Sequence, residues 1–349
     1  MLHIDGSYRE GGGQIIRTAL ALSALTRKPF KAEKIRQNRP KPGLKHQHLC
    51  CINALEKLSD ARVKGAELGS SAIEFVPGKT TPGTLWLDIG TAGSITLLLQ
   101  SLLLPSMFAD DKVQLKIKGG TDTKWSMPID YFTHVILDYF KDFASITVEA
   151  QKRGYYPKGQ GFVELNIIPV LHINDFKNIH EFISHLRTSV KRINLTEKAP
   201  LFQIRGISSA SRKLKSADVA KRQANGAKKK IGSFYPVNIE EEYEQTASIG
   251  TIITLWALGK QEKAAIGADA LGERGKRAEA VGAAAAEKLL EILNSDAVAD
   301  SHLADNIIPL LALVGGRIKT ETITEHIRSN IYVCEKFLGT RFRIDKNQN

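Results

Sequence analysis

The chain has 349 residues, of which 42% are hydrophobic and 25% are charged, and its formal net charge is +12. This composition excludes a disordered chain, and the length indicates two domains or one domain with a large insertion. The three cysteines, Cys50, Cys51 and Cys334, fit neither a disulfide framework nor a zinc-ligand spacing. We expect a cytoplasmic protein without a membrane segment, and the excess of cations favours an anionic partner such as nucleic acid.

Three glycine-rich loops that each lead into an apolar helix are predicted along the chain. They lie at residues 10–25, at 90–105 and, as a weaker copy, at 304–314. Each is followed by a strand-like stretch and then by a second helix; these second helices begin near His46, Pro128 and His326. A recurrence at roughly 80 residues signals an internal repeat. We therefore expect an α+β fold whose large domain holds three βαβαββ-type α/β repeats.

The spacing of the repeats predicts an inserted domain. The third copy begins about 210 residues after the second, which leaves an excess on the order of 100 residues between them. We expect a large domain at 1–180 and 299–349, with a smaller inserted α/β domain at 181–298. Within the insert we expect strands at 201–209, 237–243 and 250–258, and helices at 217–231 and 277–293.

Two segments are candidates for binding an anion. Glu10 is followed by three glycines and then by a helix carrying Arg17, and backbone N–H groups at such a helix N-terminus suit a phosphate. Residues 27–45 contain eight basic residues and one acidic residue, with prolines that restrict the loop, and they suit a phosphate backbone. The alternatives are an ordinary glycine turn and a solvated basic loop.

Aromatic and histidine side chains provide further candidates. Tyr155 and Tyr156 are either partners for a stacked base or core residues of a hairpin. His326 stands at the expected start of the last helix, where the helix dipole is expected to keep the imidazole neutral, as a nucleophile requires. His302 is a second candidate, and a structural role is the alternative for both histidines. The chain has no Walker A motif, nucleophile elbow or HExxH sequence.

Taken together, the motifs resemble the RNA 3′-terminal phosphate cyclase family. Eight segments carry the resemblance in register over nearly the whole chain: DGSYREGGGQIIR (5–17), RPKPGLKHQH (39–48), GAELGS (65–70), GTAGS (90–94), GGTDT (119–123), RGYYPKGQG (153–161), HLADN (302–306) and HIRSNI (326–331). The resemblance implies three α/β repeats, similar to the C-terminal domain of translation initiation factor three, with a smaller α/β domain inserted before the third.

The resemblance also implies a reaction. Members are ATP-dependent ligases that use a divalent cation, Mg or Mn, and convert an RNA 3′-phosphate end into a 2′,3′-cyclic phosphate. A histidine attacks ATP, diphosphate leaves, and AMP remains on the enzyme. AMP then passes to the RNA 3′-phosphate, and the neighbouring 2′-hydroxyl closes the ring and expels AMP. The expected partners are therefore ATP and RNA with a 3′-phosphate end.

The resemblance assigns roles to residues by position. His326 corresponds to the adenylylated histidine, and Glu10 to a carboxylate near the metal and the reacting phosphate. The other catalytic or phosphate-binding positions correspond to Arg17, Arg39 and Gln47. The expected nucleotide-binding residues are Gln100, Pro128, His302, Asp305 and Asn306.

Two alternatives remain open at this stage. One is a non-catalytic relative of the same fold that acts in ribosomal RNA processing and lacks the histidine. The other is an enolpyruvyl transferase built on similar α/β repeats. The presence of His326 favours the enzyme over the first, and the histidine together with the basic proline-containing loop argues against the second.

Overall fold

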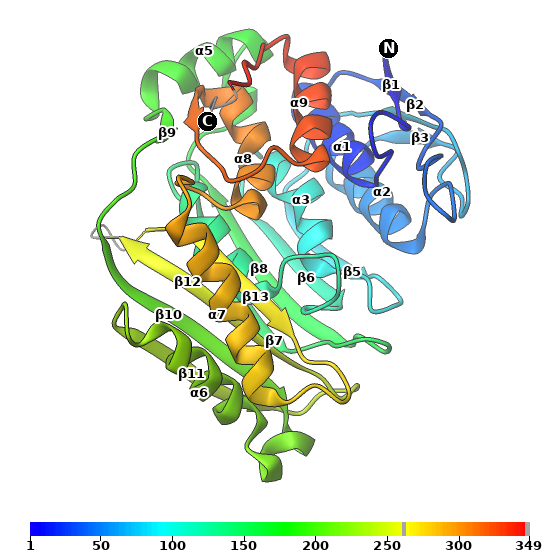
Figure 1. The fold of residues 1–349 in the computed structure, drawn as a ribbon. Helices are drawn as coiled ribbons and strands as arrows, with labels where there is room; N and C mark the ends of the chain where they lie inside the picture. Colours follow the sequence, from blue (N-terminus) through cyan, green and yellow to red (C-terminus); the bar gives the residue numbers. More distant parts are fainter. Residues whose placement is uncertain (260–262, 346–349) are drawn as a thin grey trace.

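The computed structural model describes residues 1–259 and 263–345, and two repeats of identical topology form its first half (Figure 1). Repeat one comprises β1 (Leu2–Asp5), α1 (Gln14–Thr26), β2 (Phe30–Glu33), α2 (His46–Leu58), β3 (Arg62–Lys64) and β4 (Ile73–Val76). Repeat two comprises β5 (Gly83–Asp88), α3 (Ile95–Ser106), β6 (Val113–Gly119), α4 (Ile129–Tyr131), β7 (Ala144–Lys152) and β8 (Gly161–Pro169). The sheet orders β1-β2-β4-β3 and β5-β6-β8-β7 correspond strand for strand, with one parallel and two antiparallel pairs in each. This confirms the expected βαβαββ unit.

The third repeat is shorter. It comprises β9 (Ile193–Leu195), α8 (Ser301–Val314), β14 (Gly316–Ile318) and α9 (Glu325–Leu338), and α5 (Ile179–Ser189) precedes it. Its strands β9 and β14 pair in parallel, as β1 does with β2. Within the described ranges it has no counterpart of the last two strands. The inserted unit joins β9 to α8, which is the connection that the glycine-rich loops make in the first two repeats. The insertion therefore lies inside the third repeat rather than before it.

The inserted unit is a four-stranded sheet with two helices. It comprises β10 (Leu201–Ser211), α6 (Val219–Ile231), β11 (Val237–Glu244), β12 (Thr251–Gly259), β13 (Ala264–Leu271) and α7 (Ala278–Asn294). The strand order is β11-β10-β12-β13, and α6 and α7 lie together on one face (Figure 1). Alternate residues of the strands, such as Ile204, Leu255 and Ala268, form a separate core under these helices.

The expected start of the insert at residue 181 falls inside α5. The apolar face of this helix, formed by Phe182, Ile183 and Leu186, belongs to the larger core, and the Phe182 ring lies edge-on to Phe108 at 5.0 Å. An amphipathic helix forms where its apolar face is buried. Both α5 and β9 thus pack with the repeats, and the separate core is built from residues beyond them.

Central helices bring distant segments together. The sequences of α1 and α8 are apolar around most of the helix, which is typical of buried helices, and every residue of α1 is buried. Helix α1 packs against α3 and α9, and α8 packs against α9 (Figure 1). The polar side chains that these helices carry therefore meet inside the protein.

In the described residues, no helix combines the length and apolarity needed to cross a membrane.

Candidate active site

His326 lies between two carboxylates at the start of α9. Its Nε2 atom is 2.6 Å from Oε1 of Glu10, which belongs to the loop between β1 and α1. Its Nδ1 atom is 3.7 Å from Oδ2 of Asp305, on the second turn of α8. The Arg39 guanidinium contacts the same oxygen of Glu10 at 2.9 Å. The imidazole is 43% exposed, so it is held on two sides and still accessible.

The protonation expected for His326 from the helix dipole is wrong. The carboxylates of Asp305 and Glu10 raise its pKa to about 9, although partial burial acts in the opposite direction. Conversely, His326 and Arg39 hold the pKa of Glu10 below its ordinary value. Two nearby carboxylates outweigh a helix N-terminus, whose effect is typically below about 1 kcal/mol at an exposed site. The free protein therefore carries a cationic imidazole at neutral pH.

Arg17 is a buried cation without a carboxylate partner among the described residues. Its Nη2 donates to Oε1 of Gln14 at 2.6 Å and its Nε donates to Oε1 of Gln100 at 3.0 Å, both neutral amides. Burial lowers its pKa from the ordinary value. An isolated buried charge is costly unless another charge compensates it. The environment of Arg17 is thus suited to an anion such as a phosphate.

A hydrogen-bonded network extends from Arg17 to α8 and α9. Gln14 Nε2 donates to Oδ1 of Asn330 at 3.1 Å, and Asn330 Nδ2 donates to the Asp305 carboxylate at 2.7 Å. Gln100 Nε2 donates to Oδ1 of Asn306 at 2.9 Å. Four helices therefore contribute side chains to one polar network. Such buried networks hold their members in fixed positions when every group is satisfied.

The glycine-rich loop lets the backbone approach these side chains. A Cβ atom at Gly12 would lie 2.5 Å from Oε1 of Glu10, and one at Gly13 would lie 2.1 Å from Nε2 of His48. Gly13 also caps α1 without any side-chain hydrogen bond, which leaves the first N–H groups of the helix available. Burial and the nearby Arg17 lower the pKa of His48 to about 3, so this imidazole is neutral. The loop, α1 and Arg17 together resemble a phosphate cradle.

The residues expected to bind the nucleotide lie in three separate places in the structure. Gln100, Asp305 and Asn306 line a small cavity of about 30 Å³ together with members of the polar network. His302 lines a different cavity of about 460 Å³, next to Asp269 and Lys288 on the inserted unit.

The third position belongs to Pro128, which caps α4. Three residues further on, the Tyr131 ring lies edge-on to His302 at 5.8 Å. Asp300 accepts a hydrogen bond from the Tyr131 hydroxyl at 2.5 Å and another from the Gly267 N–H at 2.7 Å. Pro128 and His302 therefore flank the Tyr131–Asp300 contact, which joins repeat two, α8 and the inserted unit.

Gln47 borders the network and does not enter it. Its amide Nε2 donates to the Ser94 carbonyl at 3.4 Å, which joins the first turn of α2 to the start of α3. The sequence patterns indicate no role for four further polar residues that are buried around Arg17 or Asp305, namely Gln14, Thr18, His48 and Asn330. The available signal was a polar residue at a buried position of an otherwise apolar helix, as at Gln14.

The two tyrosines of the RGYYPKGQG segment, for which base stacking and a core position are both open from the sequence, differ in exposure. Tyr155 is buried, against Gly250, and is therefore not available to a base. Tyr156 is exposed. Arg153 is buried among four carboxylates, at distances of 2.8 to 3.4 Å, two from repeat two and two from β11: Asp122, Asp130, Glu242 and Glu244. Arg153 thus fastens the inserted unit to repeat two.

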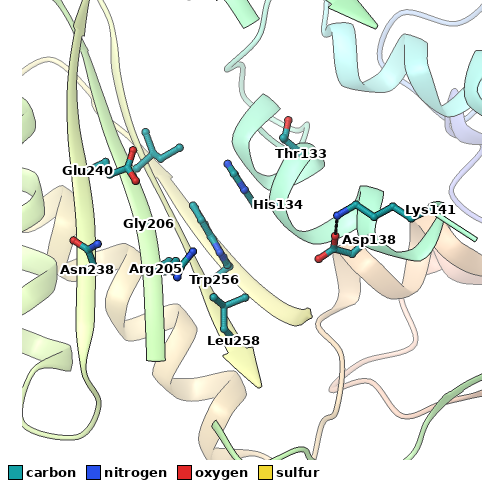
Figure 2. Close-up of a pocket in the computed structure, with 11 residues that line it drawn as sticks. Thr133, His134, Asp138, Lys141, Arg205, Gly206, Asn238, Glu240, Trp256 and Leu258 are labelled. Carbon is teal, nitrogen blue, oxygen red and sulfur yellow. Dashed lines mark hydrogen bonds and ion pairs between the residues drawn. The ribbon is translucent and has the colours of Figure 1, made fainter. Parts of the chain in front are cut away.

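A cavity of about 490 Å³ lies between the inserted sheet and the helical segment after Pro128. Figure 2 shows His134 lying over Trp256, and their ring planes are 3° apart with centroids separated by 4.3 Å. Arg205 lines the sheet side, and Lys141 pairs with Asp138 opposite (Figure 2). The cavity shares no lining residue with the His326 cluster, and its mixed charges do not favour a polyanion. Its stacked rings form a second anchor for the inserted unit.

No group of three or more His, Cys, Asp or Glu side chains within 1–259 and 263–345 is placed to hold a metal ion. Glu10 remains the one expected metal ligand. Its Oε1 atom is buried and receives no well-directed hydrogen bond from the described residues, although His326 and Arg39 lie close to it. One carboxylate combined with substrate phosphates is a common set of ligands for Mg²⁺. The residues therefore fit a cation that binds together with a phosphate.

Comparison with known proteins identifies the family. A family model described as RNA 3′-terminal phosphate cyclase matches residues 8–344. A curated protein of that name from Pyrococcus furiosus is 42% identical over 349 residues, covering 99% of this chain and 95% of the relative. A protein of the same name from Archaeoglobus fulgidus is 42% identical over 353 residues, covering 100% of this chain and 99% of the relative. Another from Methanosarcina barkeri is 43% identical over 351 residues, covering 100% of this chain and 98% of the relative. The chain therefore belongs to the RNA 3′-terminal phosphate cyclase family.

Proposed function

We propose that the protein is an ATP-dependent RNA 3′-phosphate cyclase and that His326 carries the AMP. The observation that carries this proposal is the accessible imidazole held between Glu10 and Asp305, close to the glycine-rich start of α1. Family membership supports the use of ATP and RNA. A non-catalytic RNA-processing factor would not need a nucleophile held in this way.

The reaction proceeds in three steps. His326 Nε2 attacks the α-phosphorus of ATP, a P–N bond forms, and diphosphate leaves. An oxygen of the RNA 3′-phosphate then attacks the same phosphorus, the P–N bond breaks, and an RNA-adenylate forms. Finally the 2′-hydroxyl oxygen attacks the RNA 3′-phosphorus, its proton passes to solvent and AMP departs, which leaves the 2′,3′-cyclic phosphate. Each step displaces a good leaving group, so positioning and charge neutralisation are the main requirements.

The surrounding residues have separable tasks in this mechanism. Asp305 faces Nδ1 and orients the ring so that Nε2 is directed towards the glycine-rich loop. Nε2 must lose its proton before the first attack, and the neighbouring Glu10 carboxylate, 2.6 Å away, is placed to accept it. Arg17 and the free N–H groups of α1 bind phosphate oxygens, and Arg39 lies beside the same loop.

Glu10 is also the residue that would hold a divalent cation, Mg or Mn, shared with phosphate oxygens. When bound, such a cation neutralises charge on the phosphates. Addition of Mn²⁺ with a non-hydrolysable ATP analogue should broaden the imidazole NMR signals of His326 in the wild type. The same addition should leave them sharp in Glu10→Ala. Equal broadening in both proteins would refute Glu10 as a ligand.

Labelling with α-³²P ATP tests the nucleophile. The wild type should acquire a covalent, acid-labile label, and His326→Asn should fold, bind ATP and acquire none. His302→Ala should bind ATP more weakly and keep part of the label. His180, an exposed histidine on α5, provides the matched control, and His180→Ala should label like the wild type. Full labelling of His326→Asn would mean that another residue carries the AMP.

A further inference from the structure

Two of the most exposed aromatic rings of the described chain stand on neighbouring loops. Trp125 is 93% exposed and Tyr156 is 78% exposed. The loop that carries Trp125 and the loop that carries Tyr156 run side by side, because the Thr121 N–H donates to the Gly154 carbonyl at 3.0 Å and Asp122 forms a β-bridge with Tyr155. Neither exposed ring stacks on another aromatic ring in the described part of the chain. Their apolar faces are therefore available to a partner.

The backbone at Trp125 gives a second reason to expect a partner. Its φ is +63°, a left-handed conformation that bulky residues rarely adopt. A strained backbone that presents a solvent-exposed indole contributes little to folding, since burial of the ring is the usual gain from tryptophan. Local strain of this kind is concentrated at functional contacts. The position therefore points to a contact outside the chain.

These loops are continuous with the candidate active site. Ser94, at the start of α3, forms a β-bridge with Gly120 and also accepts the hydrogen bond of Gln47. Gly159 packs closely against Ala92, two residues before Ser94. On the other side, α2 packs against α1, whose first residue follows Gly13. A chain of packed segments therefore links the glycine-rich loop with the two loops that carry Trp125 and Tyr156.

The charges beside the rings suit a polyanion. Lys158 is exposed and forms no ion pair with the described residues, and Lys124 pairs with Glu273 on the inserted unit at 2.7 Å. Exposed aromatic rings interspersed with lysines are typical of sites for single-stranded nucleic acid. A duplex keeps its base faces stacked on one another, so these rings match a single strand better.

We propose that Trp125 and Tyr156 form a stacking platform for the bases that precede the 3′-terminal nucleotide of a single-stranded RNA, with Lys158 contacting a backbone phosphate. The identity of this ligand as RNA rests on the proposed function. The platform holds the strand while its 3′-phosphate occupies the site at His326. It makes affinity depend on the single-stranded length of the RNA and not on the terminal phosphate alone.

Equilibrium binding of a fluorescent, single-stranded RNA decamer with a 3′-phosphate tests the platform. Trp125→Ala and Tyr156→Ala should each weaken binding between about 5-fold and 150-fold, the range for loss of one stacked base. Trp125→Phe should recover most of the affinity, because phenylalanine can still stack. Trp86, which is 66% exposed on β5 beside Phe162, supplies the matched control, and Trp86→Ala should bind the decamer normally.

A mononucleoside 3′-phosphate has no preceding base, so it should compete for the wild type and for Trp125→Ala with equal affinity. Unchanged binding of the decamer by both alanine variants, or equal losses for decamer and mononucleotide, would overturn the proposal. The binding assay needs neither ATP nor catalysis. A protein that binds RNA through the platform but never becomes labelled by ATP would refute the histidine mechanism and leave the platform standing.

Discussion

At the scale of the residue, His326 shows what a sequence position can and cannot reveal. Its place at a helix start was predictable, because Thr324 is a suitable N-cap and its side chain accepts the hydrogen bond of the Ile327 N–H. Its protonation was not, because the two carboxylates that set it come from positions 316 and 21 residues away in the sequence. Electrostatic neighbours of this kind are supplied by the tertiary fold. The candidate residue could thus be named from sequence, but its resting state could not.

The first prediction concerns the titration of His326 in the protein without metal or nucleotide. NMR titration of the imidazole should give a pKa near 9, because Asp305 and Glu10 stabilise the cation. In Glu10→Gln the pKa should fall by one unit or more towards the ordinary value of about 6.5. A His326 pKa below 7 in the wild type would contradict the described geometry.

At the scale of the element, the predictable parts were those with strong local patterns. The helices at 14–26, 46–58, 219–231 and 278–294 began and ended within a few residues of expectation. Strand β13 was not anticipated, because AAIGADAL has little intrinsic preference for a strand and forms one by pairing with β12. Strand β9 has three residues and is recognisable only through its partner β14. Short or weakly patterned strands depend on tertiary pairing.

The packing of α5 and β9 also changes how the chain should be divided. We propose that residues 1–195 and 298–349 form one domain and that residues 196–297 form the inserted domain. The separate core under α6 and α7 supports this division. Three contacts join the two parts: the carboxylates around Arg153, the stacked rings of His134 and Trp256, and the hydrogen bond from the Gly267 N–H to Asp300.

The second prediction tests the Arg153 contact. Arg153→Met leaves the buried Asp122 and Asp130 without their cation, so the free energy of unfolding at pH 8 should fall by about 3–5 kcal/mol. Burial already raises the pKa of Asp122 to about 6 in the folded protein, despite Arg153. Between about pH 6 and about pH 4 the folded state therefore holds a proton on Asp122 that the unfolded chain does not bind, and the contribution of Asp122 to stability rises as the pH falls through this window.

Arg153→Met lacks the cation that favours the charged form of Asp122. The decrease in its free energy of unfolding, relative to the wild type, should therefore be smaller at pH 5 than at pH 8. Denaturant unfolding at the two pH values provides the measurement. Arg222 is the matched control, since it pairs with Glu279 on the same inserted unit but both side chains are 39% exposed. Arg222→Met should destabilise the protein much less than Arg153→Met, because solvent screens an exposed ion pair. Equal losses for the two variants would mean that Arg153 is not the principal fastening.

At the scale of the whole molecule, the insertion replaces one of three equivalent loops. In repeats one and two the connection from the first strand to the first helix is a short glycine-rich loop, and in the third repeat it is the entire inserted unit. The two ends of that unit lie close together because β9 pairs with β14, which follows α8. An insertion at such a position leaves the packing of the central helices intact, and it places the inserted sheet beside α4 and His302. This arrangement could not be read from the chain, because repeat spacing shows how much is inserted but not into which connection.

The third prediction concerns the net charge of +12 and where RNA meets it. The loop at 36–45 lies next to Glu10 through Arg39, and Lys41 within it is exposed and forms no ion pair with the described residues. We expect Lys41 to neutralise one RNA phosphate. Lys41→Ala should then weaken binding of a single-stranded RNA and make the slope of log affinity against log salt less negative by about 0.7. Lys64→Ala removes the same charge from β3, where Lys64 is 85% exposed beside Glu74, and should leave the slope unchanged. Because both variants lower the net charge equally, a slope that changes alike in both would show that RNA senses the overall charge of the protein and not this loop.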